Sequence, residues 1–194
     1  MKSLLIHSIL TITTALAIIA PMACDQSAPT PTKNATNSTN TTNAALPKDL
    51  FITQEPTGAL GVLKVRQSAK AGDHVTMIGR IGGSENPFVS NRAVFTMVDA
   101  SVKTCLEMGD ANCPTPADYC CEDSTELAKS MASVNITDKS GKPLAISLAA
   151  DGSLRPLMWI AVEGTLQPTD GGAFIVNADH IYKMPNDPLA SKLK

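Results

Sequence analysis

Aromatic side chains and surplus positive charge are both scarce in this sequence. Phe, Tyr and Trp together make up 4% of the 194 residues. The 16 Lys and Arg are outnumbered by 18 Asp and Glu, so the formal net charge is −2. Proteins that bind nucleic acids need a basic surface and often rings on which bases stack. The composition therefore argues against a nucleic-acid partner.

Signatures of catalysis are missing too. The sequence has no G-x-S-x-G, no C-x-x-C and no His-x-x-x-His, and it has only three histidines. Nothing around His74 or His180 suggests a Ser-His-Asp triad, and without C-x-x-C a thioredoxin-like site is excluded. We therefore predict a protein that is not an enzyme.

The first 24 residues, "MKSLLIHSILTITTALAIIAPMAC", have the layout of an export signal: Lys2, then an apolar stretch, then small residues. "PMAC" resembles the lipobox of bacterial lipoproteins, in which a lipidated cysteine becomes the N-terminus. That resemblance implies a signal peptide over residues 1–23 and lipidation of Cys24. Pro21 departs from the pattern, and "ALA" at residues 15–17 offers an ordinary cleavage site instead. An uncleaved membrane span is a further alternative.

Residues 24–49 follow as the lipidated cysteine and a tether rich in Thr, Asn and Pro. This composition buries too little apolar surface to offset the entropy of ordering, so we expect a disordered spacer. The localisation that follows is an exported protein, periplasmic or on the outer surface, lipid-anchored to a membrane of the cell envelope. Residues 50–194 are long enough for one domain with its own core.

Several segments of this domain alternate apolar and polar residues, as half-buried strands do. They are residues 74–83, 92–99, 157–167 and 173–182, together with 131–148, which we expect to form two strands around the turn "DKSG". Only residues 123–131 are expected to be helical, with Asp123 or Ser124 as the N-cap. The sequence predicts a small all-β domain.

The order of these segments resembles an OB-fold. "VTMIGRI" places Gly79 where such a first strand coils, the next strand ends at Asp99, "VEG" repeats the pattern at Gly164, and the last strand ends with Ile181. The resemblance implies a five-stranded, partly open barrel. The helix usually found between the third and fourth strands is missing. A cysteine-rich insertion, residues 100–130, lies instead between the second and third strands.

The stretch "CLEMGDANCPTPADYCCED" holds Cys105, Cys113, Cys120 and Cys121. Disulfides suit an exported protein, and we expect Cys105 and Cys113 each to pair with one of the two adjacent cysteines. A Cys120–Cys121 bridge is disfavoured because neighbouring Cα atoms lie too close together. The insertion would then be stapled to the barrel and no cofactor would be bound. Reactive thiols are a further alternative.

A metal site is the competing interpretation. The spacing C-x7-C-x6-C-C differs from the short pairs of structural zinc sites, and adjacent cysteines diverge if the chain is extended. Thiolates nevertheless suit Cu(I) or Zn, and His180 would join the four cysteines if the barrel brought it near.

Three functions follow in order of preference. The first is a membrane-anchored, non-catalytic binding lipoprotein whose envelope ligand or protein partner is unknown. The second is a metal-handling (Cu or Zn) lipoprotein that uses the cysteine loop. The third is an OB-type nucleic-acid-binding domain.

Overall fold

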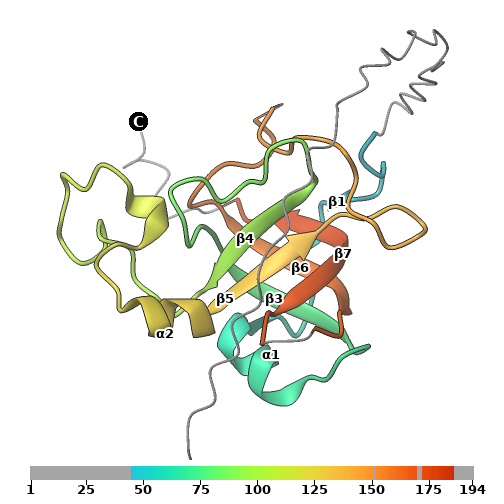
Figure 1. The fold of residues 1–194 in the computed structure, drawn as a ribbon, viewed down its shortest axis with the longest axis horizontal. Helices are drawn as coiled ribbons and strands as arrows, with labels where there is room; N and C mark the ends of the chain where they lie inside the picture. The colour runs from blue at the N-terminus through green and yellow to red at the C-terminus, as the bar shows by residue number, and fades with distance from the viewer. Residues whose placement is uncertain (1–44, 151, 170–171, 186–194) are drawn as a thin grey trace, which may run out of the picture. The chain divides into compact units, whose positions relative to one another are not determined.

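Five strands close into a barrel in the computed structural model, which describes residues 45–150, 152–169 and 172–185 (Figure 1). The strands are β3 (His74–Ile81), β4 (Val94–Asp99), β5 (Met131–Asn135), β6 (Trp159–Leu166) and β7 (Ile175–Lys183). The described residues belong to one compact unit, residues 41–194. The predicted signal peptide, Cys24 and most of the predicted tether lie outside the described residues.

The pairing of the strands closes the ring. Antiparallel ladders join β3 to β4, β4 to β5, β7 to β6 and β6 back to β3, and a parallel ladder joins β5 to β7. If the five barrel strands are numbered 1 to 5 along the chain, they pair around the barrel in the order 1-2-3-5-4-1. This is the Greek-key order of an OB-fold. The predicted all-β, OB-like barrel is confirmed, although it is closed rather than partly open.

Two short strands extend the sheet. β1 (Phe51–Ile52) runs parallel to β7, and β2 (Leu60–Gly61) runs parallel to β3. Among the described residues, no helix has the length and hydropathy of a membrane span.

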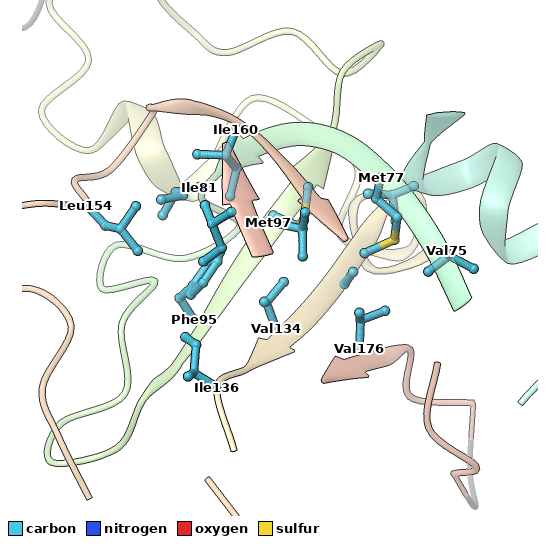
Figure 2. Packing of buried hydrophobic residues seen from close by; sticks show 14 of the residues in the cluster. Val75, Met77, Ile81, Phe95, Met97, Val134, Ile136, Leu154, Ile160 and Val176 are labelled. Carbon is cyan, nitrogen blue, oxygen red and sulfur yellow. The ribbon is translucent and has the colours of Figure 1, made fainter. Parts of the chain in front are cut away.

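The core of the barrel consists of the inward side chains that the alternation predicted. Val75, Met77 and Ile81 from β3 meet Phe95 and Met97 from β4, and all but Val75 are fully buried. Figure 2 shows these side chains converging on the interior, together with those of the other strands. Burial of this apolar surface is the main favourable contribution to the stability of the barrel.

Two glycines allow strands to approach closely, as the sequence predicted. A Cβ atom on Gly79 would lie 2.3 Å from the carbonyl oxygen of Val98, and one on Gly164 would lie 2.2 Å from that of Asn177. Both positions therefore exclude any side chain. At Gly164 the register between β6 and β7 also shifts, which marks a bulge.

One of the two strands expected over residues 131–148 is absent. The chain leaves β5 after Asn135, and only an isolated bridge between Thr137 and Pro143 marks the expected hairpin. Leu148 and Leu154 from the following coil are buried in the core instead. The described part of residues 136–158 contains no helix, in agreement with the prediction for this connection.

Helix α1 (Val62–Ser68) was not predicted. Its Val62 and Val65 are buried in the core, but seven residues give a weak periodic signal. A distant side chain supports its first turn: Leu63 N donates to Asp99 Oδ2 over 2.8 Å. This tertiary contact satisfies an amide that lacks a partner within the helix, so local sequence could not reveal it.

The insertion between β4 and β5 lies at one side of the barrel, where Figure 1 draws it as the yellow-green loop beside α2. It contains a 3-10 turn (Pro116–Asp118) and helix α2 (Ser124–Lys129). Asp123 is the N-cap of α2, since its carboxylate accepts from Thr125 N and Glu126 N, as the sequence predicted.

Candidate metal centre

The insertion has a small hydrophobic core of its own. Val98 from the barrel packs with Ala117, Tyr119 and Leu157, and four partly buried apolar side chains surround them. Gly82 makes room for this contact, because a Cβ there would lie 2.8 Å from Cε2 of Tyr119. The insertion is therefore attached to the barrel by apolar packing that involves no cysteine.

A buried arginine joins the insertion to the outside of the barrel. Arg80 alternates with the inward residues Gly79 and Ile81 of β3 and so points outward, yet it is only 1% exposed because the insertion covers it. Its Nη1 donates to Glu107 Oε2 over 2.6 Å, and its Nη2 donates to the carbonyl oxygen of Val102. The guanidinium also lies over the rings of Trp159 and Tyr119, 4.7 and 5.8 Å from their centroids.

Glu107 is held in place from both sides. Besides Arg80, its Oε2 accepts from Thr104 N over 2.8 Å and from Thr104 Oγ1 over 3.1 Å. Burial by itself raises the pKa of Glu107, but these bonds and the positive charge of Arg80 outweigh it and lower the pKa from its ordinary value. The carboxylate is thus kept ionised two residues away from Cys105.

Tyr119 turns the chain so that its ring faces the small core. Its backbone is left-handed, with φ of 58° and ψ of 38°, which is uncommon for a residue with a side chain. The following Cys120 N donates to Asp118 Oδ1 over 2.9 Å and fixes this turn. The buried phenol has a pKa raised to about 12, chiefly because burial disfavours the phenolate.

The four cysteines of the insertion come together. Sγ of Cys105 lies 3.4 Å from Sγ of Cys120, and Sγ of Cys113 lies 3.7 Å from the same atom. The sulfurs of Cys105, Cys120 and Cys121 all lie within 4.8 Å of one another. Cys105 is buried, whereas Cys120 and Cys121 are exposed.

The adjacent cysteines do not diverge as an extended pair would. Cys120 and Cys121 lie in a turn that follows Tyr119, so both sulfurs approach Cys105. The objection to joint ligation that the sequence raised therefore does not apply. A turn of this kind could not be foreseen, because it depends on the left-handed backbone of Tyr119.

All four thiols are free, and the described residues contain no disulfide. A disulfide bond is about 2.04 Å long, well below the observed separations. The predicted pairing of Cys105 and Cys113 with the adjacent cysteines stays a prediction, since Cys120 lies close to both.

The thiols also influence one another's protonation. Burial raises the pKa of Cys105, but hydrogen bonds from the thiols of Cys121 and Cys120 outweigh it and lower the pKa overall. Each of these hydrogen bonds with Cys105 in turn raises the pKa of its donor, Cys120 or Cys121. Cys105 is therefore favoured as the first of these thiols to lose its proton, because the neighbouring thiols donate hydrogen bonds to its thiolate.

His180 does not join the cysteines. It lies on β7 opposite Glu163 of β6, and its Nδ1 is 3.0 Å from the carbonyl oxygen of Asp49. The other strand histidine, His74, pairs with Asp179 over 3.2 Å at the surface. Among the described residues, the three-sulfur group is the one cluster of Cys, His, Asp or Glu close enough to hold a metal ion.

Comparisons with known proteins add little. No protein-family model matches the chain, and no curated protein matches it either. Among solved structures the chain is similar to the hypothetical protein ygiW from E. coli, with 15% sequence identity and a TM-score of 0.36. That match covers 66% of this chain and 94% of the other. A likeness this distant carries no argument about function.

Proposed function

We propose that this chain is a membrane-anchored, non-catalytic protein of the cell envelope that binds a soft metal ion through the cysteines of its insertion. The observation that carries the proposal is the spacing of the sulfurs. Thiolates bound to one ion through bonds of about 2.3 Å, the usual Zn–S length, lie ~3.8–4.0 Å apart. The separations of 3.4 and 3.7 Å are close to that value and far from a disulfide bond.

The donor set fits a soft metal. Thiolates select Zn, Cu(I) and iron–sulfur clusters over hard cations such as Mg²⁺ or Ca²⁺. The three-sulfur group includes no carboxylate or imidazole. Cys105, Cys120 and Cys121, whose sulfurs all lie within 4.8 Å of one another, would hold the ion, and its ligation would tie Cys105 to the turn at Cys120.

The insertion has attachments to the barrel besides its cysteines. The Arg80–Glu107 ion pair and the packing of Tyr119 already attach it to the barrel. The thiols are therefore available for another role, which favours binding over stapling.

Export and anchoring rest on the sequence alone. The apolar segment before Cys24 and the polar tether after it support a lipidated chain that carries its domain at some distance from the membrane. In such a place a metal-binding domain would meet ions that enter the envelope.

A second candidate is the binding of an envelope ligand on the barrel. A groove of about 360 Å³ crosses β5 between the two helices and is lined by Arg66, Met131, Ser133 and Phe174, among others. Arg66 lies over the Phe174 ring, 4.6 Å from its centroid, and donates to the carbonyl oxygen of Met131. This groove offers one cation and one ring, too few to favour a nucleic-acid strand.

The test is metal binding by the full chain, purified in detergent under reducing, oxygen-free conditions. We expect one equivalent of Zn²⁺ or Cu(I) by elemental analysis after dialysis, with loss of the titratable thiols. Cys105→Ser should abolish retention, while Cys24→Ser, a matched change outside the insertion, should leave it intact. Two disulfides by mass spectrometry of the non-reduced chain, with no metal retained after reduction, would overturn the proposal.

A further inference from the structure

The four sulfurs are not equivalent. Cys105, Cys120 and Cys121 form a group in which every sulfur is within 4.8 Å of the others, and Cys113 lies outside that group. We infer that the centre takes monovalent copper, bound by these three thiolates, and that Cys113 is not one of its ligands. The inference rests on the proposed metal-binding function and specifies its ion.

Three-coordination follows from the arrangement of the sulfurs. A tetrahedral site needs six sulfur–sulfur edges of ~3.8 Å each. Cys113 has such an edge with Cys120, at 3.7 Å, but it does not approach all three other sulfurs within 4.8 Å. A trigonal site with bonds of about 2.3 Å needs only three edges of ~4.0 Å, and the three-sulfur group can supply them with small movements.

The position of each cysteine in the chain supports the same division. Cys105 is fully buried and follows Thr104, which is also buried and bonded to Glu107. Cys120 and Cys121 are carried by the turn that Tyr119 anchors in the small core. Cys113, itself half-buried, lies between these two fixed points and directly follows an exposed stretch, Met108 to Asn112.

The choice of ion follows from the donors. Zn²⁺ bound by three protein ligands keeps a fourth position for water, as it does in catalytic sites. Among the described residues, the three-sulfur group includes no histidine or carboxylate that could serve as a fourth zinc ligand. Cu(I) is soft, prefers sulfur and is satisfied by three thiolates, so the group as it stands is a complete coordination shell.

The test compares two ions and two classes of variant on the reduced full chain. Cu(I) is added from an acetonitrile stock against a competing chelator, Zn²⁺ is added in parallel, and X-ray absorption counts the sulfur ligands. We expect one Cu(I) with three sulfur ligands. Cys105→Ser and Cys121→Ser should each weaken Cu(I) binding by more than about 100-fold, since even outer partners of metal ligands cost 10–100-fold. Cys113→Ser, the matched control, should leave the affinity unchanged.

Cys121→Ser alters an exposed residue, so it keeps the test valid if the change at buried Cys105 prevents folding. Zn²⁺ bound by four sulfurs, or a loss of Cu(I) affinity in Cys113→Ser equal to that in Cys121→Ser, would overturn the three-thiolate assignment and leave metal binding standing. If neither ion binds the reduced chain, the proposed function itself is wrong, and the assignment falls with it.

Discussion

Arg80 Nη1 donates to Glu107 Oε2 over 2.6 Å, with the arginine side chain 1% exposed and the glutamate side chain 27% exposed. The pair connects a barrel strand to the loop that carries the cysteines. It places a full positive charge between two aromatic rings, where the ion pair replaces much of the water that the guanidinium gives up. The position of Cys105 therefore depends on an ion pair two residues away.

Glu107→Ala should lower the free energy of unfolding by about 3–5 kcal/mol, because it leaves the buried Arg80 without its charged partner. Arg80→Met with Glu107→Ala should cost less than the sum of the two single changes. Urea unfolding of the four proteins gives the coupling energy directly.

A matched ion pair provides the control. Lys129 and Glu126 on α2 are separated by 2.6 Å, but both side chains are more than half exposed. Their coupling energy should be far smaller than that of the Arg80–Glu107 pair, because both side chains remain in water, where exposed pairs contribute little. Equal coupling energies for the two pairs would show that burial of Arg80 contributes nothing to the attachment of the insertion.

Tyr119→Phe should leave stability unchanged or raise it by up to about 1 kcal/mol. The Tyr119 hydroxyl is buried and has no hydrogen-bond partner among the described residues, and an unpaired buried hydroxyl is costly. The ring, which packs in the small core, is retained. Thermal unfolding measures the change, and a loss of more than about 1 kcal/mol would mean that the hydroxyl does have a partner.

Alternation of apolar and polar residues was sufficient to predict the five barrel strands. Each of them buries one face, so the period of two is visible in the sequence. The coil after β5 failed the same test. Its stretch "PLAISL", residues 143–148, mimics a strand, but Leu148 at the end of this stretch is buried without a strand around it, as is Leu154. Buried apolar residues form a strand only where a neighbouring strand is available for backbone hydrogen bonds, and this segment has only an isolated bridge.

The site was only partly visible in the sequence. The cysteines were recognised, but the alternation of β3 places Arg80 on its outward face, and such a face is usually solvated. Its burial depends on Glu107 and Tyr119 of the insertion, which lie 27 and 39 residues further along the chain. The pair "GG" at Gly82 was the available signal, because a glycine beside a strand often marks a close approach of another segment.

Gly79→Ala should strongly destabilise the barrel, since the added methyl would meet the carbonyl oxygen of Val98 at 2.3 Å. Overpacking of this kind typically costs 1–3 kcal/mol or more. Gly109→Ala is the comparison, because that glycine has open space around it and only its φ of 99° opposes a side chain. Urea midpoints should fall further for Gly79→Ala; a smaller fall than for Gly109→Ala would contradict the close approach of β3 and β4.

Cys24→Ser should move the protein from the membrane fraction to the soluble fraction, because lipidation of this residue is the anchor that the sequence predicts. Fractionation and intact mass of the N-terminus measure the effect. Ser27→Ala, a change in the tether, should leave the protein in the membrane. A Cys24→Ser variant that stays in the membrane with residues 1–23 uncleaved would identify the segment as a transmembrane anchor.

Removal of the metal should loosen residues 105–123 and leave the barrel intact. The ion would tie Cys105 to the turn at Cys120. The Arg80–Glu107 ion pair and the packing of Tyr119 hold the chain near these two cysteines, so loss of the ion frees mainly the residues between them. The apolar interior of the barrel, with Phe95 and Met97, has no contact with sulfur ligands that could transmit a larger change. Hydrogen exchange of the full chain with and without a chelator should therefore differ in residues 105–123, and Lys103→Ala should show the same difference. Faster exchange throughout β3 and β4 after chelation would mean that the insertion and the barrel unfold as one cooperative unit.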